Sequence, residues 1–106
     1  MTLAGLTVTS RSEGATEHLR VRGQIDIATV DALADEIGEA LAREPQTVVV
    51  DLSAVGFIGS GGLRALLEAD VRARAGGCRL VVVPGTGVVR RLLDRTNADR
   101  TLTLAP

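Results

Sequence analysis

The sequence predicts a single α/β domain in which a mixed β-sheet packs against helices. Segments near the N-terminus alternate apolar and polar residues, as half-exposed strands do. Two later runs, residues 47–52 and 80–83, are rich in β-branched residues, which is typical of strands covered on both faces. Other stretches repeat apolar residues at helical spacing. The predicted order is ββαβαβαβ, and strands joined through helices are expected to be parallel neighbours with right-handed crossovers.

The outer strands are expected at residues 6–9, 18–23 and 101–104, all of which alternate. Residues 10–17 are expected to form the loop between the first two, which read as an antiparallel pair with one face in water. The last segment suits an exposed edge strand. A glycine-rich turn is expected directly after the buried strand at residues 47–52.

Three helices are expected. The first follows Thr29, a candidate N-cap, and should end before Pro45 because the residue preceding a proline resists the α region. The second carries an apolar stripe over residues 63–71, and the third carries one over residues 88–93. Thr86 is a candidate cap for the third helix.

Length and composition limit the possible functions. A chain of 106 residues makes one domain, so residues 1–106 are assigned to it. Apolar residues are 45% and charged residues 24%, which is typical of a globular protein. The 12 basic and 13 acidic side chains nearly cancel, and Phe57 is the only aromatic residue. No direct binding of DNA or RNA is therefore expected, since both the basic surface and the stacking platform are missing.

The scarce residue types exclude further classes. Cys78 is the only cysteine and His18 the only histidine, so neither a disulfide nor a Cys/His metal site is expected, and Cys78 reads as a small core residue. The first ten residues lack the basic start of a signal peptide. The longest uncharged stretch, residues 52–63, is shorter than the roughly 20 residues of a membrane span. We expect a cytoplasmic protein without membrane insertion, metal or cofactor.

Two glycine turns come close to known chemical motifs. Residues 59–64 and 85–90 both begin like a dinucleotide-binding fingerprint, but each has an arginine at the third glycine position. Ser60 has only half of a nucleophile elbow, because Ile58 stands where that motif has its first glycine. His18 precedes it on a strand and reads as a surface residue. An enzyme is therefore not expected.

Ser60 and its glycines allow two interpretations. On the residues alone, Ser60 is best read as an N-cap of the second helix, and Asp26 as a turn or cap residue. A cap does not require Gly59, Gly61 and Gly62 around it, and glycine in a helix costs up to ~1 kcal/mol relative to alanine. Such a turn makes sense where something approaches the backbone closely. A helix N-terminus also favours a phosphate.

Two segments resemble a known family. Gly-Gln-Ile-Asp-Ile-Ala-Thr at residues 23–29 and Val-Asp-Leu-Ser-Ala-Val-Gly-Phe-Ile-Gly-Ser-Gly-Gly-Leu at residues 50–63 resemble the STAS domain of bacterial anti-sigma factor antagonists. Val-Val-Arg-Arg-Leu-Leu at residues 88–93 is similar to the last helix of that family. The resemblance extends over residues 6–104 and implies the mixed sheet packed with helices that the periodicity also predicts.

The resemblance implies a regulatory switch. In such antagonists a serine is phosphorylated by a partner that is both anti-sigma factor and serine kinase, and the unphosphorylated form binds that partner and releases a sigma factor. By position, Ser60 matches the phosphoacceptor. Asp26 and Thr29 match a region that lines the partner surface. The remaining residues expected on that surface are Gly59, Gly61, Gly62, Leu63 and Arg64.

The chain departs from the family pattern beside the serine. Gly59 replaces the usual Asp, Gly61 replaces a Ser or Thr, and Gln24 replaces Glu. The change at position 59 removes a carboxylate that a kinase could read, and the change at position 61 removes a second acceptor. These departures keep an alternative open: a non-phosphorylated STAS adaptor or ligand-binding module in a transporter or sensory complex.

Overall fold

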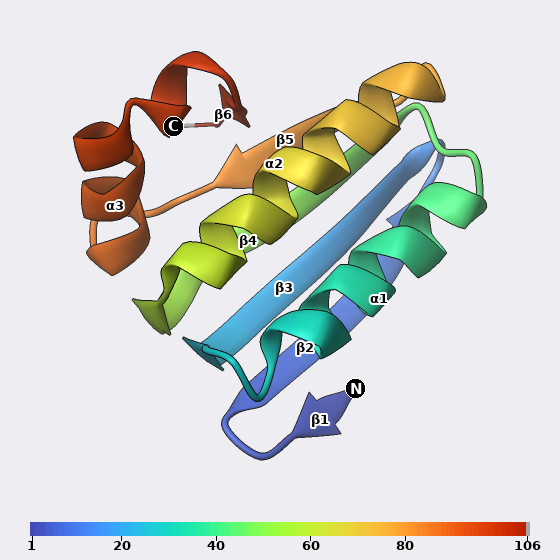
Figure 1. The fold of residues 1–106 in the computed structure, drawn as a ribbon. Coiled ribbons are helices and arrows are strands. Elements are labelled where there is room, and N and C mark those ends of the chain that lie inside the picture. The colour runs from blue at the N-terminus through green and yellow to red at the C-terminus, as the bar shows by residue number, and fades with distance from the viewer. Residues whose placement is uncertain (106) are drawn as a thin grey trace.

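The computed structural model describes residues 1–105 and shows an α/β fold built on one mixed sheet (Figure 1). The strands lie in the order β1-β2-β3-β4-β5-β6, antiparallel from β1 to β3 and parallel from β3 to β6. The strands are β1 (Thr2–Leu3), β2 (Leu6–Glu13), β3 (Thr16–Ile25), β4 (Thr47–Ile58), β5 (Arg79–Val83) and β6 (Thr103–Leu104). The helices are α1 (Val30–Ala42), α2 (Ser60–Ala75), α3 (Val88–Thr96) and the short 3₁₀ helix η1 (Ala98–Arg100).

This architecture confirms the predicted fold class and the order ββαβαβαβ. The structure adds β1 in front of that order and η1 before the last strand, two short elements that the pattern does not predict. Pro106, the last residue of the predicted domain, lies outside the described residues.

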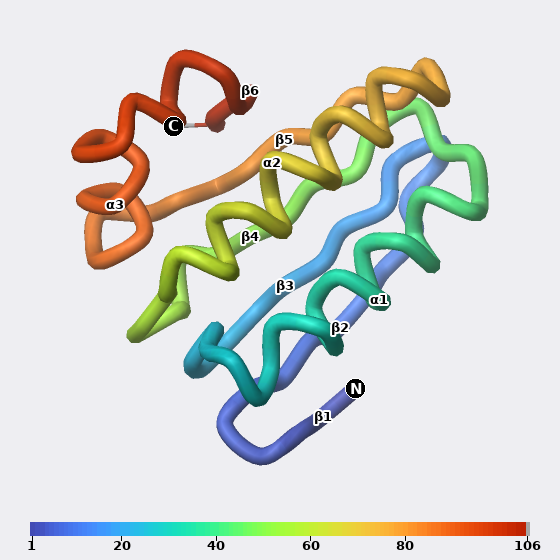
Figure 2. Tube along the Cα trace, viewed as in Figure 1, coloured from blue at the N-terminus to red at the C-terminus, as the bar shows by residue number. Residues whose placement is uncertain are grey.

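Helices α1 and α2 pack against each other on one face of the sheet, and α3 stands apart beside β4 (Figures 1 and 2). The apolar stripes of the helices meet alternate residues of the strands. Leu33 on α1, Leu66 on α2 and Val50 on β4 are fully buried in this core. Arg20 and Arg22, which alternate with the buried positions of β3, are exposed. The alternation that predicts a strand with one face in water is thus present in β3.

The prediction of a loop at residues 10–17 is wrong. Strands β2 and β3 extend through most of that segment, from the pair Leu6↔Gly23 to the pair Glu13↔Thr16. Only Gly14 and Ala15 lie outside the two strands, and Gly14 adopts the positive φ of +59° that favours glycine. Polar side chains replace apolar alternation here, which is why the sequence pattern does not show the strands.

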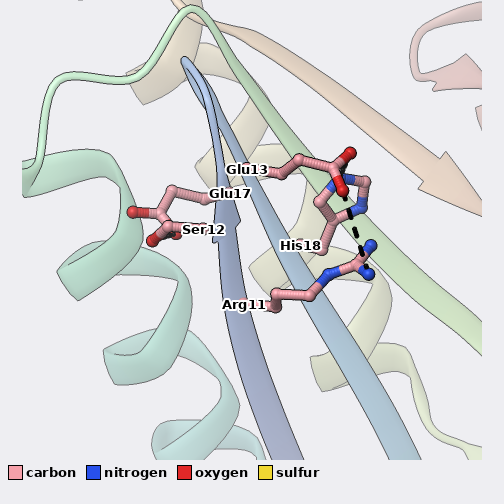
Figure 3. A network of polar contacts seen from close by, with 5 residues as sticks. All are labelled: Arg11, Ser12, Glu13, Glu17 and His18. Carbon is pink, nitrogen blue, oxygen red and sulfur yellow. Dashed lines mark hydrogen bonds and ion pairs between the residues drawn. The ribbon is translucent and has the colours of Figure 1, made fainter.

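Contacts within and across the hairpin support its polar end (Figure 3). The Ser12 hydroxyl donates a hydrogen bond to Oε2 of the buried Glu17 at 2.6 Å. Elsewhere in the hairpin, the Glu13 carboxylate lies 4.0 Å from both His18 Nε2 and Arg11 Nη1. Cross-strand pairs of this kind stabilise a sheet without an apolar pattern.

Strand β4 is also longer than predicted. The glycine-rich turn expected after Leu52 is instead strand, which continues to Ile58. The pairing with β3 shifts twice over this stretch, between Arg20 and Arg22 and between Gly23 and Gln24, so that β4 contains extra residues. Such bulges re-aim side chains near the end of a strand.

The helix boundaries differ by small amounts from the expected ones. Thr29 precedes α1 as predicted, and α1 ends at Ala42, before Pro45. Gly87, not Thr86, directly precedes α3, so Thr86 is not its cap. No helix among residues 1–105 is both long and apolar enough to cross a membrane.

Cys78 lies just before β5 and is buried, as expected for a small core residue. Burial disfavours the thiolate and raises the pKa of the Cys78 thiol. A reactive thiol needs the opposite environment, so this cysteine serves packing.

Candidate functional site

The candidate site lies at the edge of the sheet where β3 and β4 end. Ile25 and Ile58 are the last paired residues of these parallel strands, and the Gly59 N–H donates a hydrogen bond to the Ile25 carbonyl at 3.0 Å. The loop after β3 and the first turn of α2 therefore begin side by side (Figure 1). In open α/β sheets, ligands bind outside the carboxyl ends of the strands.

Ser60 is the first residue of α2 and is exposed. It is not the N-cap, so that interpretation is wrong. The N-cap is Gly59, whose carbonyl accepts the first helical hydrogen bonds, from the Gly62 and Leu63 N–H groups at 3.0 and 3.3 Å. Within residues 1–105, the Ser60 hydroxyl makes no side-chain hydrogen bond. It is available at the positive end of the helix dipole.

The loop between β3 and α1 is held by its own hydrogen bonds. Thr29 is 1% exposed, and its hydroxyl donates to the Gln24 carbonyl at 2.8 Å and accepts from the Asp26 N–H at 3.0 Å. The Asp26 carboxylate accepts from the Ala28 N–H at 2.9 Å, which confirms its interpretation as a turn residue. Thr29 thus positions the loop from inside, and Asp26 is only partly exposed at its surface.

The loop and the end of β4 present two apolar side chains that the sequence interpretation missed. Ile27 is 97% exposed and Phe57 is 50% exposed. The Phe57 ring lies beside Gly59, where an added Cβ would be 3.7 Å from its Cε2 atom. Exposed apolar side chains gathered at one edge are typical of protein interaction sites. The one available signal was Ile27 itself, an isolated apolar residue between a strand and a helix.

The remaining expected residues occupy different environments. Gly61 is exposed, whereas Gly62 lies on the buried side of α2. Leu63 is partly buried and packs on the core. The Arg64 side chain is 82% exposed, and its Nε atom lies 3.5 Å from Oε1 of Glu68.

Comparisons with known proteins agree on one family. The family model described as "Mlab, STAS domain" matches residues 8–105. The anti-sigma-F factor antagonist RsfB of Mycobacterium tuberculosis is 36% identical over 99 residues, which cover 93% of this chain and 80% of that protein. The crystal structure of an anti-sigma factor antagonist from Mycobacterium paratuberculosis superposes with a TM-score of 0.80 at 34% identity, covering 95% of this chain and 86% of the other.

A more distant structure shares the fold. The anti-sigma factor antagonist SpoIIAA, in its unphosphorylated form, superposes with a TM-score of 0.77 over 94% of this chain and 89% of its own. The two sequences are 17% identical, so this similarity concerns the arrangement of sheet and helices alone.

Proposed function

This chain belongs to the STAS-domain family of anti-sigma factor antagonists, and from that premise we propose that it binds an anti-sigma factor until Ser60 is phosphorylated. The partner in this proposal is an anti-sigma factor that is also a serine kinase, and its capture releases a sigma factor in the cytoplasm. The chain itself performs no catalysis. One observation carries the proposal: an exposed serine hydroxyl lies at a helix N-terminus on the same edge as two exposed apolar side chains.

The proposed partner surface is built around that serine. Ile27 and Phe57 supply apolar contact area, and burying them against a partner removes that area from water. Asp26 and Arg64 supply charges of opposite sign that orient the partner. The Ser60 hydroxyl is small and neutral enough to be buried in such an interface.

Phosphorylation would make the Ser60 side chain unsuitable for burial in the partner interface. A phosphate brings a charge of about −1.5 to −2 to the Ser60 oxygen. In an interface it would lose its hydration without an assured cation, which is costly. On the free protein, water and the α2 N-terminus stabilise it. The modified antagonist therefore dissociates and the partner becomes free.

The first experiment incubates the protein with a candidate kinase and ATP and maps the modification by mass spectrometry. We expect phosphate on Ser60 and none on a Ser60→Ala variant. Thr29 is an internal control, because its hydroxyl is buried and hydrogen-bonded. Phosphate at Thr29 or Thr86 in place of Ser60 would contradict the assignment.

The second experiment measures affinity for the partner. Ser60→Ala should bind like the unmodified protein, whereas Ser60→Asp should bind about tenfold or more weakly because of its added charge. Equal affinities of the two variants would argue against a charge switch.

A second function is favoured by Gly59 alone. With glycine at position 59, no carboxylate stands next to Ser60 in the sequence for a kinase to recognise. A domain without that feature suits a constitutive STAS adaptor or ligand-binding module in a transporter or sensory complex. Recovery of membrane-transport subunits and no kinase in a pull-down would select this function over the switch.

A further inference from the structure

We propose that Arg64 receives the Ser60 phosphate within the same helix and thereby leaves the partner surface. This inference rests on the proposed phosphorylation of Ser60. Ser60 and Arg64 are four residues apart on α2, and both are exposed. Residues at this spacing are neighbours on a helix surface. In the unmodified protein the Arg64 side chain points along the helix toward Glu68, with its Nε atom 3.5 Å from Oε1. Helical side chains favour rotamers that lean toward the N-terminus, so a change of rotamer would bring the Arg64 guanidinium over the turn that begins with Ser60.

Arg64 is the only arginine of α2 near that turn. Arg72 lies three turns further along, near Gly38 of α1. Arg74 is engaged at the far end of the helix, with its Nε 3.0 Å from Oδ2 of the buried Asp70. Of the three arginines in this helix, Arg64 alone is placed to meet a charge at its N-terminus.

The present partner of Arg64 is a weak competitor. The pair with Glu68 is open to water, with the two side chains 82% and 73% exposed, and exposed pairs contribute little. Its order is also unfavourable, because an acid placed N-terminal to its base is the better arrangement on a helix. A phosphate on Ser60 would stand in that better order, with up to two charges and three acceptor oxygens. Arginine can bind such a group through two parallel hydrogen bonds.

The neighbourhood leaves room for this exchange. An added Cβ at Gly61 would meet nothing within 4 Å, so open space flanks the serine. Asp26 in the loop and Asp31 in the first turn of α1 are acidic groups at the same end of the sheet, and their effect on the phosphate is the same whether or not Arg64 is present. The difference between variants at position 64 therefore isolates the arginine.

The exchange has a consequence for binding. In the unmodified protein Arg64 is exposed and paired with the similarly exposed Glu68, so it can exchange that weak pair for an acidic group of the partner. After modification the same guanidinium neutralises part of the phosphate charge. Phosphorylation then acts twice on one surface, since it adds an anion and withdraws a cation.

The test places phosphoserine at position 60 during translation, so that no kinase is required. ³¹P NMR then follows the second ionisation of the phosphate as pH is varied. A nearby Arg64 guanidinium favours the phosphate dianion. The second pKa of the phosphate should therefore be about 0.2 to 0.4 pH units lower with Arg64 present than in the Arg64→Gln variant. Glu68→Gln removes the competitor and should lower the pKa further. Arg72→Gln, which removes an equal charge about 18 Å away, should leave it unchanged.

The outcomes separate this inference from the function on which it rests. Equal pKa values in wild type and Arg64→Gln would overturn the Arg64 contact and leave the phospho-switch standing. A clear difference, combined with a partner that binds both phosphorylated and unmodified protein equally, would overturn the switch and leave the contact standing. Arg64 is exposed, so its replacement should not affect folding, and circular dichroism checks this.

Discussion

The three glycines around Ser60 differ in what surrounds each of them. A Cβ at Gly62 would lie 2.7 Å from Ile58 Cγ1 and 2.8 Å from Ile25 Cγ2, closer than packed atoms can approach. A Cβ at Gly61 would stand in open space, and one at Gly59 would make ordinary contact with Phe57. The close approach that the sequence suggested for this turn is therefore made at Gly62 by the chain's own strands. The backbone at position 59 therefore has room for the Cβ of a side chain, so glycine is not required there by contact at that atom.

This contrast predicts opposite effects of one change at adjacent positions. Gly62→Ala should lower the free energy of unfolding by about 1–3 kcal/mol, because the buried methyl group overpacks the two isoleucines. Gly61→Ala is the matched control and should be neutral or stabilising by up to about 1 kcal/mol, since alanine restricts the unfolded chain. Urea denaturation of both variants measures the difference. Equal free energies of unfolding for the two variants would show that the packing around Gly62 does not require glycine.

At the scale of elements, the loop after β3 is a small hydrogen-bonded unit that presents Ile27. Its centre is the buried Thr29 hydroxyl, which binds the Gln24 carbonyl and the Asp26 N–H at once. The unit keeps a short segment fixed although its most apolar side chain is in water. A rigid display of this kind lowers the entropy that binding must offset.

Thr29→Val should release this loop while keeping the shape of the side chain. Two backbone groups lose their partner, and we expect a loss of about 1–3 kcal/mol in stability. Thr29→Ser keeps the hydroxyl and should retain most of it. Hydrogen exchange at the Asp26 amide should accelerate in the valine variant only. If exchange is equally slow in both variants, the hydroxyl does not hold the loop.

Elements also show what the sequence can predict. The sequence predicts the helices and the buried strands correctly because their apolar residues recur at the spacing of a helix or a strand. The polar end of the β2–β3 hairpin and the second half of β4 were missed, because contacts such as Ser12 to Glu17 and the bulges of β4 depend on the partner strand. In the candidate site, too, the features set by the local sequence are predictable and those set by neighbouring elements are not. Parallel strands place Asp26 and Ser60 at one edge predictably, whereas the exposure of Ile27 and Phe57 depends on what lies around them.

At the scale of the whole molecule, the two ends of α2 have separate tasks. Its N-terminal turn belongs to the candidate site, and its C-terminal turn holds the last segment of the chain. The buried Asp70 pairs with Arg74, and Arg74 Nη2 donates to the Thr101 carbonyl at 2.9 Å. Strand β6 has only two residues paired with β5, so the Arg74 hydrogen bond adds a side-chain anchor to the burial of Leu102 and the bond from the Ala105 N–H to the Val82 carbonyl.

Arg74→Gln should therefore loosen the C-terminal segment without affecting the candidate site. The variant leaves the buried Asp70 without its cation, and we expect a stability loss of about 1–3 kcal/mol, discounted because the Arg74 side chain is 62% exposed. Amide exchange at residues 101–104 should rise first, because their anchor is lost. Arg72→Gln removes the same charge from the same helix and should change neither quantity. Ser60 lies about 21 Å from position 74 along α2, beyond the screening length in physiological salt, so partner affinity should stay at the wild-type value. A drop in affinity without global unfolding would mean that the two ends of α2 are coupled and that its tasks are not separate.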